Sequence, residues 1–219
     1  MSHPTRTGTD PDEARTRILD VAEEHFRRVG YHKTSVADIA SELGMSSANV
    51  YRFFPSRDAI NESICERVVN EVAGIATAIA GTNAPATQKL DELLTSVHHR
   101  IKMTFVKEKH MHDLIVAAMR ENWAIIKAHR ERMVTIFEAI IREGTEAGAF
   151  EVEDSAEAAR AVKCALMPFL HPILIEQAVR RGEDTETSLR NQIRFILKAL
   201  SGRTKQSAVF RSDVFVHGK

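Results

Sequence analysis

Residues 34–57 read TSVADIASELGMSSANVYRFFPSR and carry the most specific structural signal in the sequence. Apolar residues recur at helical spacing in the first half of the segment, and Gly44 interrupts the pattern. Ser46 or Ser47 can cap a second, very short helix, which Pro55 ends because proline cannot continue the helical hydrogen-bond ladder. The segment therefore predicts two short helices joined by a tight turn, as in a helix-turn-helix.

The composition of the second helix is typical of a surface that contacts DNA. Met45, Val50 and Phe54 are expected to face a small core. The stretch from Gly44 to Arg57 contains no Asp or Glu, whereas a solvated helix face normally carries Glu and Lys. In a helix-turn-helix the second helix enters the major groove. The outward face predicted for this helix consists of Ser47, Ala48, Asn49, Tyr51, Arg52 and Phe53.

The rest of the chain predicts an all-α fold, because helical periodicity dominates and alternating patterns are almost absent. A first helix is expected from Asp10-Pro11 to Gly30, and a long helix follows Ser56 over about 57–80. A further helix is expected around residues 90–105, and others over about 112–120, 123–147 and 185–200. The stretch 155–181 predicts one long helix that bends at Pro168 and Pro172.

These elements divide the chain into four parts. Residues 1–11 predict a flexible polar arm, 12–57 a helix-turn-helix domain, and 58–202 a helical ligand-binding and dimerisation domain. Residues 203–219 form a tail with an apolar patch at Phe210, Val214, Phe215 and Val216. The linker 81–85, with Gly81 and Pro85, is a further candidate boundary.

Composition excludes several classes of protein. Thirty Lys and Arg balance 30 Asp and Glu, so a diffuse basic coat is excluded and any DNA site must be local. Two distant cysteines exclude a disulfide scaffold and favour a reducing cytoplasm. No apolar run is long enough for a membrane span, and the start is too polar for a signal peptide. Catalytic motifs are absent, so we expect neither an enzyme nor a cofactor.

The run RILDVAEEHFRRVGYHKTSVADIASELGMSSANVYRFFPSRDAI, residues 17–60, resembles the DNA-binding domain of TetR-family bacterial transcriptional regulators. The resemblance rests on AxxxFxxxGY, TSVxDIA and YxFFPSRDA, and covers the first quarter to third of the chain. Beyond it, the chain follows the family in length and helical character. The resemblance implies a homodimeric repressor that binds a palindromic DNA operator and is released by a small-molecule effector.

Carried over to this sequence, the resemblance implies a role for each exposed position of the segment. Thr34, Ser35, Tyr51 and Arg57 would contact DNA phosphates, the first two with help from the positive end of a helix. Ser46, Ser47 and Asn49 would lie at the front of the recognition helix, where an Asn amide can bind adenine.

Three neighbouring positions of the same helix leave alternatives open. Arg52 would read a guanine or bind a phosphate. Ala48 stands where many members have Gly, and could contact a thymine methyl group. Phe53 stands where many have His, and could instead pack under the long helix 57–80.

The last two predicted helices are apolar over a wide arc, which indicates burial on more than one side. The resemblance implies that they form a four-helix dimer interface with a second copy; completion of the monomer core is the alternative reading. The candidate interface residues are Leu166, Leu170, Ile173, Leu174, Leu189, Ile193, Ile196 and Leu197.

The middle helices gather methionines and aromatic residues, which suit a mostly apolar small molecule but also an ordinary core. His98 and His171 could bond such a ligand, and the five histidines within 98–129 leave a metal-responsive regulator as an alternative. An all-α protein-interaction module without ligand response is another. The candidate pocket residues are His98, Met103, Phe105, Met119, Trp123, Met133, Phe137, Phe169 and His171.

Overall fold

The computed structural model describes residues 10–202, which form helices joined by turns and loops and contain no strand within that range. The predicted all-α fold class is confirmed. The elements are α1 (Pro11–Val29), a short 3₁₀ helix (Tyr31–Lys33), α2 (Val36–Glu42), α3 (Ser47–Tyr51), α4 (Arg57–Ala80), α5 (Ala86–Lys107), α6 (Lys109–Arg120), α7 (Ala124–Glu146), α8 (Ser155–Ala165), α9 (Met167–Leu170), α10 (Pro172–Arg180) and α11 (Thr185–Leu200). Residues 1–9 of the predicted arm 1–11, and the whole predicted tail 203–219, lie outside the described range. The last two residues of the predicted arm belong to a helix instead, since Asp10 caps α1 and Pro11 is its first residue.

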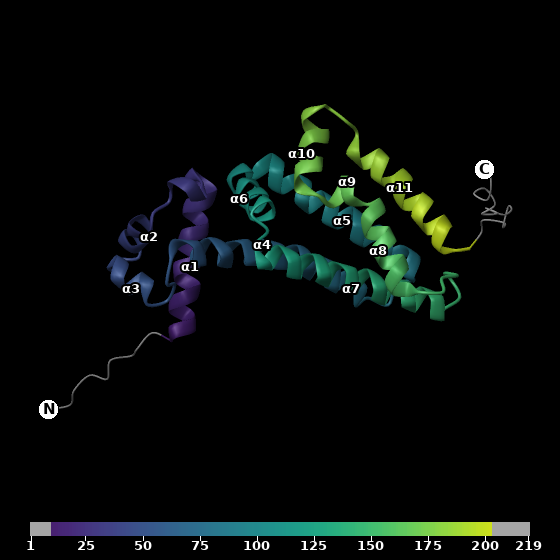
Figure 1. The fold of residues 1–219 in the computed structure, drawn as a ribbon, viewed down its shortest axis with the longest axis horizontal. Coiled ribbons are helices and arrows are strands. Elements are labelled where there is room, and N and C mark those ends of the chain that lie inside the picture. The colour runs from purple at the N-terminus through teal and green to yellow at the C-terminus, as the bar shows by residue number, and fades with distance from the viewer. Residues whose placement is uncertain (1–9, 203–219) are drawn as a thin grey trace, which may run out of the picture.

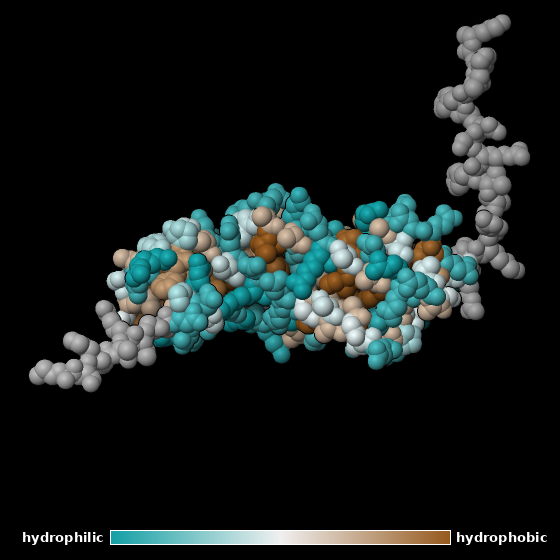
Figure 2. All heavy atoms as spheres, turned by 90° about the horizontal axis from the view of Figure 1, so that it is seen from below, coloured by the Kyte–Doolittle hydropathy of each residue, from teal (hydrophilic) through white to brown (hydrophobic). Residues whose placement is uncertain are grey.

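The helices form two bodies joined by α4 (Figure 1). Helices α1, α2 and α3 make a small head at one end, and the long α4 leaves this head and runs beside α7. Helices α5 and α8 to α11 complete a larger helical body around them. On the face in Figure 2, apolar side chains (brown) are exposed in separate patches, with polar side chains (teal) between them.

Two clusters of buried apolar side chains account for this arrangement. The head core contains Ile18, Phe26 and Val50, and the larger core contains Leu90, Phe137 and Ile193 among others. Burial of such side chains contributes about 1.5–3 kcal/mol each relative to exposure.

Helix α4 belongs to both cores. Its first half buries Ile60 and Ile64 in the head core, and its second half buries Val72 and Ile79 in the larger core. Residues 81–85 are therefore an exposed turn between two helices of the same core, since Ile79 of α4 and Ala86 of α5 lie in one cluster. The expectation of a domain boundary at this linker is wrong.

Several helix ends follow the local signals in the sequence. Asp10 caps α1 by accepting a bond from the Asp12 backbone N–H, and Gly30 ends this helix with φ of 92°, a value that favours glycine. Ser56 caps α4 in the same manner, by accepting a bond from Ala59 N–H.

The segment 155–181 differs from the single bent helix that we expected. It forms α8, α9 and α10, which are separated at Leu166 and at His171. Pro168 and Pro172 lie in the first turns of α9 and α10, where a backbone N–H is not needed for the helical ladder. The prolines therefore start new helices instead of bending one.

Candidate DNA-binding surface and ligand cavity

The helix-turn-helix is assembled by side-chain caps around a tight turn. Ser35 accepts a bond from Asp38 N–H at 3.1 Å and the Asp38 carboxylate accepts one from Ser35 N–H at 2.8 Å, which forms a capping box at the start of α2. Bonds from the Ser35 hydroxyl and N–H hold the pKa of Asp38 below its usual range. Gly44 makes the turn with φ of 66°, and Ser46 caps α3.

Helix α2 is held against α1 by a polar contact that sequence reasoning missed. His25 Nε2 of α1 lies 2.6 Å from Glu42 Oε2 at the end of α2, and Arg28 lies 3.8 Å from the same carboxylate. No spacing rule links residues so far apart in the chain. The contact fixes the angle of α2, and thereby the direction in which α3 projects.

The exposed side of α3 carries most of the predicted DNA contacts. Ser46, Ala48 and Arg52 are exposed, and Tyr51 is 47% exposed although it is a large aromatic residue. Ser35, at the start of α2, is also exposed. Ser47 is half-buried. These side chains are therefore available to a groove or a phosphate.

Asn49 is half-buried and weakly held. Its amide nitrogen lies 3.9 Å from Met45 Sδ, and its oxygen lies 3.5 Å from Arg52 Nη1, which is at the limit of a hydrogen bond. The amide is thus not committed to a strong internal partner, and it can turn toward a base edge.

Three further positions of the segment have contacts inside the head. Thr34 is buried and its hydroxyl donates to Gly30 C=O at 3.0 Å, so the predicted phosphate contact by this hydroxyl is wrong. Phe53 is half-buried and packs against the head core, which is the alternative expected for it. Arg57 donates through Nη2 to the Tyr31 carbonyl, so its phosphate contact stays a prediction with an internal competitor.

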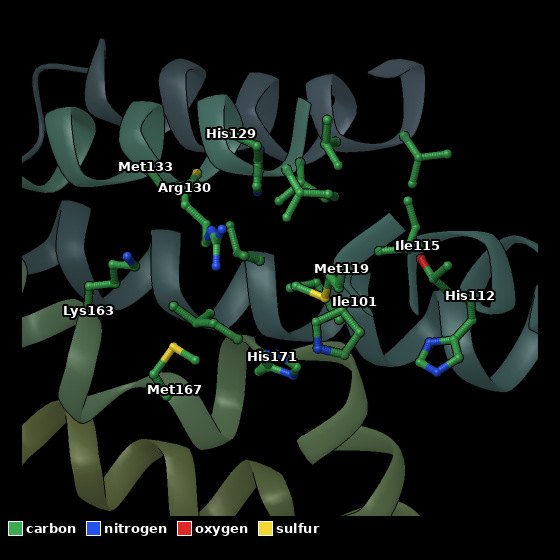
Figure 3. Close-up of a pocket in the computed structure, with 18 of the residues that line it drawn as sticks. Ile101, His112, Ile115, Met119, His129, Arg130, Met133, Lys163, Met167 and His171 are labelled. Atoms are coloured by element: carbon green, nitrogen blue, oxygen red, sulfur yellow. The ribbon is translucent and has the colours of Figure 1, made fainter. Parts of the chain in front are cut away.

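A cavity of about 180 Å³ lies in the larger body, next to the head. Its wall is mostly aliphatic, and side chains from α4, α5, α6, α7 and the α8–α10 segment point into it (Figure 3). The polar residues in the wall are Thr104, His112, His129, Arg130, Lys163 and His171.

Four of the predicted pocket residues line this cavity, namely Met119, Met133, Phe137 and His171. Five do not. Trp123 packs against the head core, and Phe105 lies behind the wall with its ring 5.0 Å from that of His112. Met103 and His98 border a separate surface groove, and Phe169 packs edge-on against His98.

His98 is buried as a structural group and not as a ligand contact. Nδ1 lies 2.8 Å from the Phe169 carbonyl oxygen and Nε2 lies 3.1 Å from Thr185 Oγ1. Because the carbonyl can only accept, Nδ1 carries the proton and Nε2 accepts from the threonine. Burial lowers the pKa of His98, which favours this neutral form.

The polar residues of the cavity wall were missed, apart from His171. Arg130 and His129 follow the ordinary pattern of an amphipathic helix, and nothing in that pattern shows that α7 borders an open space. His112 pairs with Glu176 of α10 at 2.9 Å, a contact between residues 64 positions apart. Within residues 10–202, no three His, Cys, Asp or Glu side chains are grouped so that they could hold a metal ion.

The cavity and the head share two helices. Val68 and Val69 of α4 and Ile115 of α6 belong to the head core and also line the cavity. The head is further tied to the start of α6, because Arg27 pairs with Glu108, and Glu108 also pairs with Arg100 of α5 at 3.2 Å. The base of the head and one side of the cavity wall are therefore built from the same side chains.

The predicted dimer residues divide into two groups. Leu166, Leu189, Ile193 and Ile196 are buried in the larger core of the monomer, so their prediction as interface residues is wrong and the alternative reading applies. Leu170, Ile173 and Leu197 are half-buried, and Leu174 is exposed. These four remain candidates.

Two exposed apolar residues were missed on the same helices. Phe195 of α11 is 67% exposed, and Met167 of α9 is also exposed. Phe195 lies off the buried stripe formed by Ile193 and Ile196, and this departure is the sequence signal that could have identified it.

Family comparisons agree with this architecture. A family described as bacterial regulatory proteins, tetR family, matches residues 18–64, and one described as tetracyclin repressor-like, C-terminal domain, matches residues 86–189. The two matches cover the helix-turn-helix and most of the larger body. The chain belongs to the TetR family. Members of this family are transcriptional regulators and not enzymes. The predicted class of protein, a transcriptional regulator, is confirmed.

Individual relatives of this TetR-family chain are distant. The HTH-type transcriptional repressor KstR2 of Rhodococcus jostii is 28% identical over 87 residues, which are 40% of this chain and 43% of that relative. The match thus spans less than half of the relative's length. The TetR-family regulator PfmR of Thermus thermophilus is 24% identical with a TM-score of 0.54, covering 83% of this chain and 97% of PfmR.

A further solved structure shows the fold alone. A transcriptional regulator from Cytophaga hutchinsonii is 19% identical, with a TM-score of 0.62 over 84% of this chain and 96% of that one. No helix within residues 10–202 of our chain has both the length and the apolar character needed to cross a membrane.

Proposed function

We propose that the chain is a homodimeric repressor that binds a palindromic operator through α3 and leaves it when a small, mostly apolar effector enters the cavity. The observation that carries this proposal is the sharing of α4 and α6 between the head core and the cavity wall. An effector can shift the head only through different affinities for two states of the protein. The shared helices supply a physical reason for that difference.

The DNA-binding part of the proposal rests on α3. One head reads only half a site, so useful affinity requires two heads at the spacing of successive major grooves. The exposed apolar residues of α9 to α11, with Phe195 foremost, support a second copy on that side. Chromosomal DNA as the target would place the protein in the bacterial cytoplasm.

Fluorescence anisotropy with labelled DNA flanking the chain's own gene, at several salt concentrations, tests the proposal. We expect tight, selective binding that weakens steeply with salt. Tyr51→Ala should weaken binding to all sequences alike, whereas Asn49→Ala should cost about 1–3 kcal/mol at one base-pair position. Arg142→Gln, an exposed change on α7, is the control. Intact operator binding in both head variants would contradict the assignment of α3.

The same assay separates the two roles open to Arg52. If this side chain binds a phosphate, Arg52→Gln should reduce the salt slope by about one and spare sequence preference. If it reads a guanine, the variant should relax preference at one position instead.

A further inference from the structure

The cavity wall combines an apolar body with one charged end. Among the residues that line it, none is Asp or Glu, while Arg130 of α7 and Lys163 of α8 are cationic. Figure 3 shows both at the same end, beside Met133 and Met167, whereas His112 and Ile115 lie at the opposite end. Both cationic side chains of the wall thus lie at one end of the cavity.

Neither cation is neutralised by the described part of the protein. Within residues 10–202, no carboxylate lies within 4.0 Å of the Arg130 guanidinium or the Lys163 ammonium, whereas Lys127 of α7 pairs with Glu131. Lys163 is half-buried and Arg130 is exposed, so the charged end of the wall is open to solvent. Two like charges at the end of an apolar space attract an anion, and an Arg guanidinium can bind a carboxylate through two parallel bonds.

Two histidines supply further unused bonding capacity at this cavity. Nδ1 of His129 and Nδ1 of His171 are buried and have no hydrogen-bond partner. Burial, with Arg132 nearby, lowers the pKa of His129 to about 4, and burial together with Arg130 lowers that of His171. Both rings are therefore neutral near pH 7, and each can donate one N–H without adding charge.

We propose that the effector is an apolar monocarboxylate, whose carboxylate is bound by Arg130 and Lys163 and whose body fills the aliphatic part of the cavity. This inference rests on the proposed function, because it names the ligand class of the same cavity. A dry cavity of about 150 Å³ accommodates benzene, so 180 Å³ suits a phenyl ring or a short alkyl chain. A cationic ligand is disfavoured, since it would meet two positive charges and no acid.

Isothermal titration calorimetry of the full chain without DNA tests the ligand class. The probes are hexanoate, octanoate, phenylacetate and 4-phenylbutyrate, each paired with its primary amide as a neutral match of the same size. We expect at least one carboxylate to bind about 10-fold or more tightly than its amide. The inference is overturned if no carboxylate binds with a dissociation constant below about 1 mM, or if the amides bind equally well.

Variants then test whether Arg130 and Lys163 bind the carboxylate of the probe. Arg130→Gln and Lys163→Gln should each reduce carboxylate affinity about 10-fold while leaving amide affinity unchanged. Arg130→Lys should restore part of the loss, and Arg142→Gln, exposed on the same helix and outside the cavity wall, should have no effect. Circular dichroism confirms that each variant is folded. Unchanged carboxylate affinity in both Gln variants would overturn the assignment.

A second readout separates this inference from the proposed function. The bound probes are added to the operator complex and release is followed by anisotropy. A carboxylate that binds through Arg130 but leaves DNA affinity unchanged supports the ligand class and contradicts effector-driven release. Release by the amides at the same concentrations as the carboxylates would uphold the proposed function and overturn the ligand class.

Discussion

The head and the larger body reach stable helices by different routes. In the head, α2 and α3 are short, and each begins after a serine whose side chain accepts a bond from the backbone N–H three residues on. In the larger body, α5, α6 and α7 begin without any side-chain cap, although Asp154 and Asp184 cap α8 and α11. Short helices are marginal alone, so the head needs local signals, while long apolar helices are stabilised by packing. Function follows the same division, with an exposed reading face in one region and an internal cavity in the other.

Two matched phenylalanines provide the strongest test of this difference between the regions. Phe26 in the head core and Phe137 in the larger core are both fully buried, but only Phe137 borders the cavity. Phe26→Ala should destabilise the protein by about 3–5 kcal/mol, and Phe137→Ala by less, because part of its surface already faces open space. Urea unfolding at one fixed protein concentration measures both. An equal or larger loss for Phe137→Ala would mean that its contacts are as complete as those of Phe26.

Acid should weaken the larger body through the histidine in the cavity wall. The folded pKa of His129 is about 4, below the ordinary value of 6.5. Above pH 6.5 both states are neutral, and between 6.5 and 4 only the unfolded state takes up the proton, so stability falls as pH falls. The contribution is at most about 3 kcal/mol. Unfolding from pH 7.5 to 4.5 should show a smaller loss in His129→Gln.

His99→Gln, exposed on α5, is the matched control for this titration. The same loss of stability in His129→Gln as in the unchanged chain would show that other groups cause the acid sensitivity.

Glycines on two helices of the larger body should respond in opposite directions. A methyl group at Gly144 would lie 2.2 Å from the Phe150 ring and 2.9 Å from Ala86, whereas one at Gly74 would meet nothing within 4 Å. Gly144→Ala should therefore cost about 1–3 kcal/mol by overpacking, which outweighs the better helix propensity of Ala. Gly74→Ala should stabilise by about 0.5–1 kcal/mol. Thermal unfolding compares the pair, and a gain in both would mean that the Phe150 ring moves aside easily.

The smallest effect concerns the local signals of the head. Ser35→Ala removes the capping box of α2 and should cost about 1 kcal/mol, whereas Ser188→Ala on the exposed side of α11 should change stability by less than about 0.5 kcal/mol. Urea unfolding without DNA measures the two. Equal effects would contradict the view that the head depends on its caps.

The difference between the head and the larger body also explains which features could be predicted from the sequence. The caps at Asp10, Ser46 and Ser56 are local, so the helices of the head were predicted from spacing, whereas the DNA-binding roles of its residues came from the family resemblance. Thr34 was misjudged because its hydroxyl turns inward to Gly30, a choice made by tertiary packing.

Helical periodicity in the sequence could not predict where the cavity lies. A helical stripe tells which side of a helix is buried but not whether it meets a neighbour or an empty space, so His98 and Phe169 were expected at a pocket that Arg130 and Lys163 line instead. The same limit applies to Leu189 and Ile193, whose stripe faces the monomer core and not a second copy.

The coupling between the two regions is tested most directly by reciprocity. The dissociation constant of a carboxylate probe that binds in calorimetry is measured with and without saturating operator DNA, and that of the operator with and without saturating probe. If α4 and α6 transmit the state of the cavity to the head, operator should weaken probe binding by the same factor by which the probe weakens operator binding, in the range of about 5- to 150-fold. A probe affinity that operator DNA leaves unchanged would contradict the account.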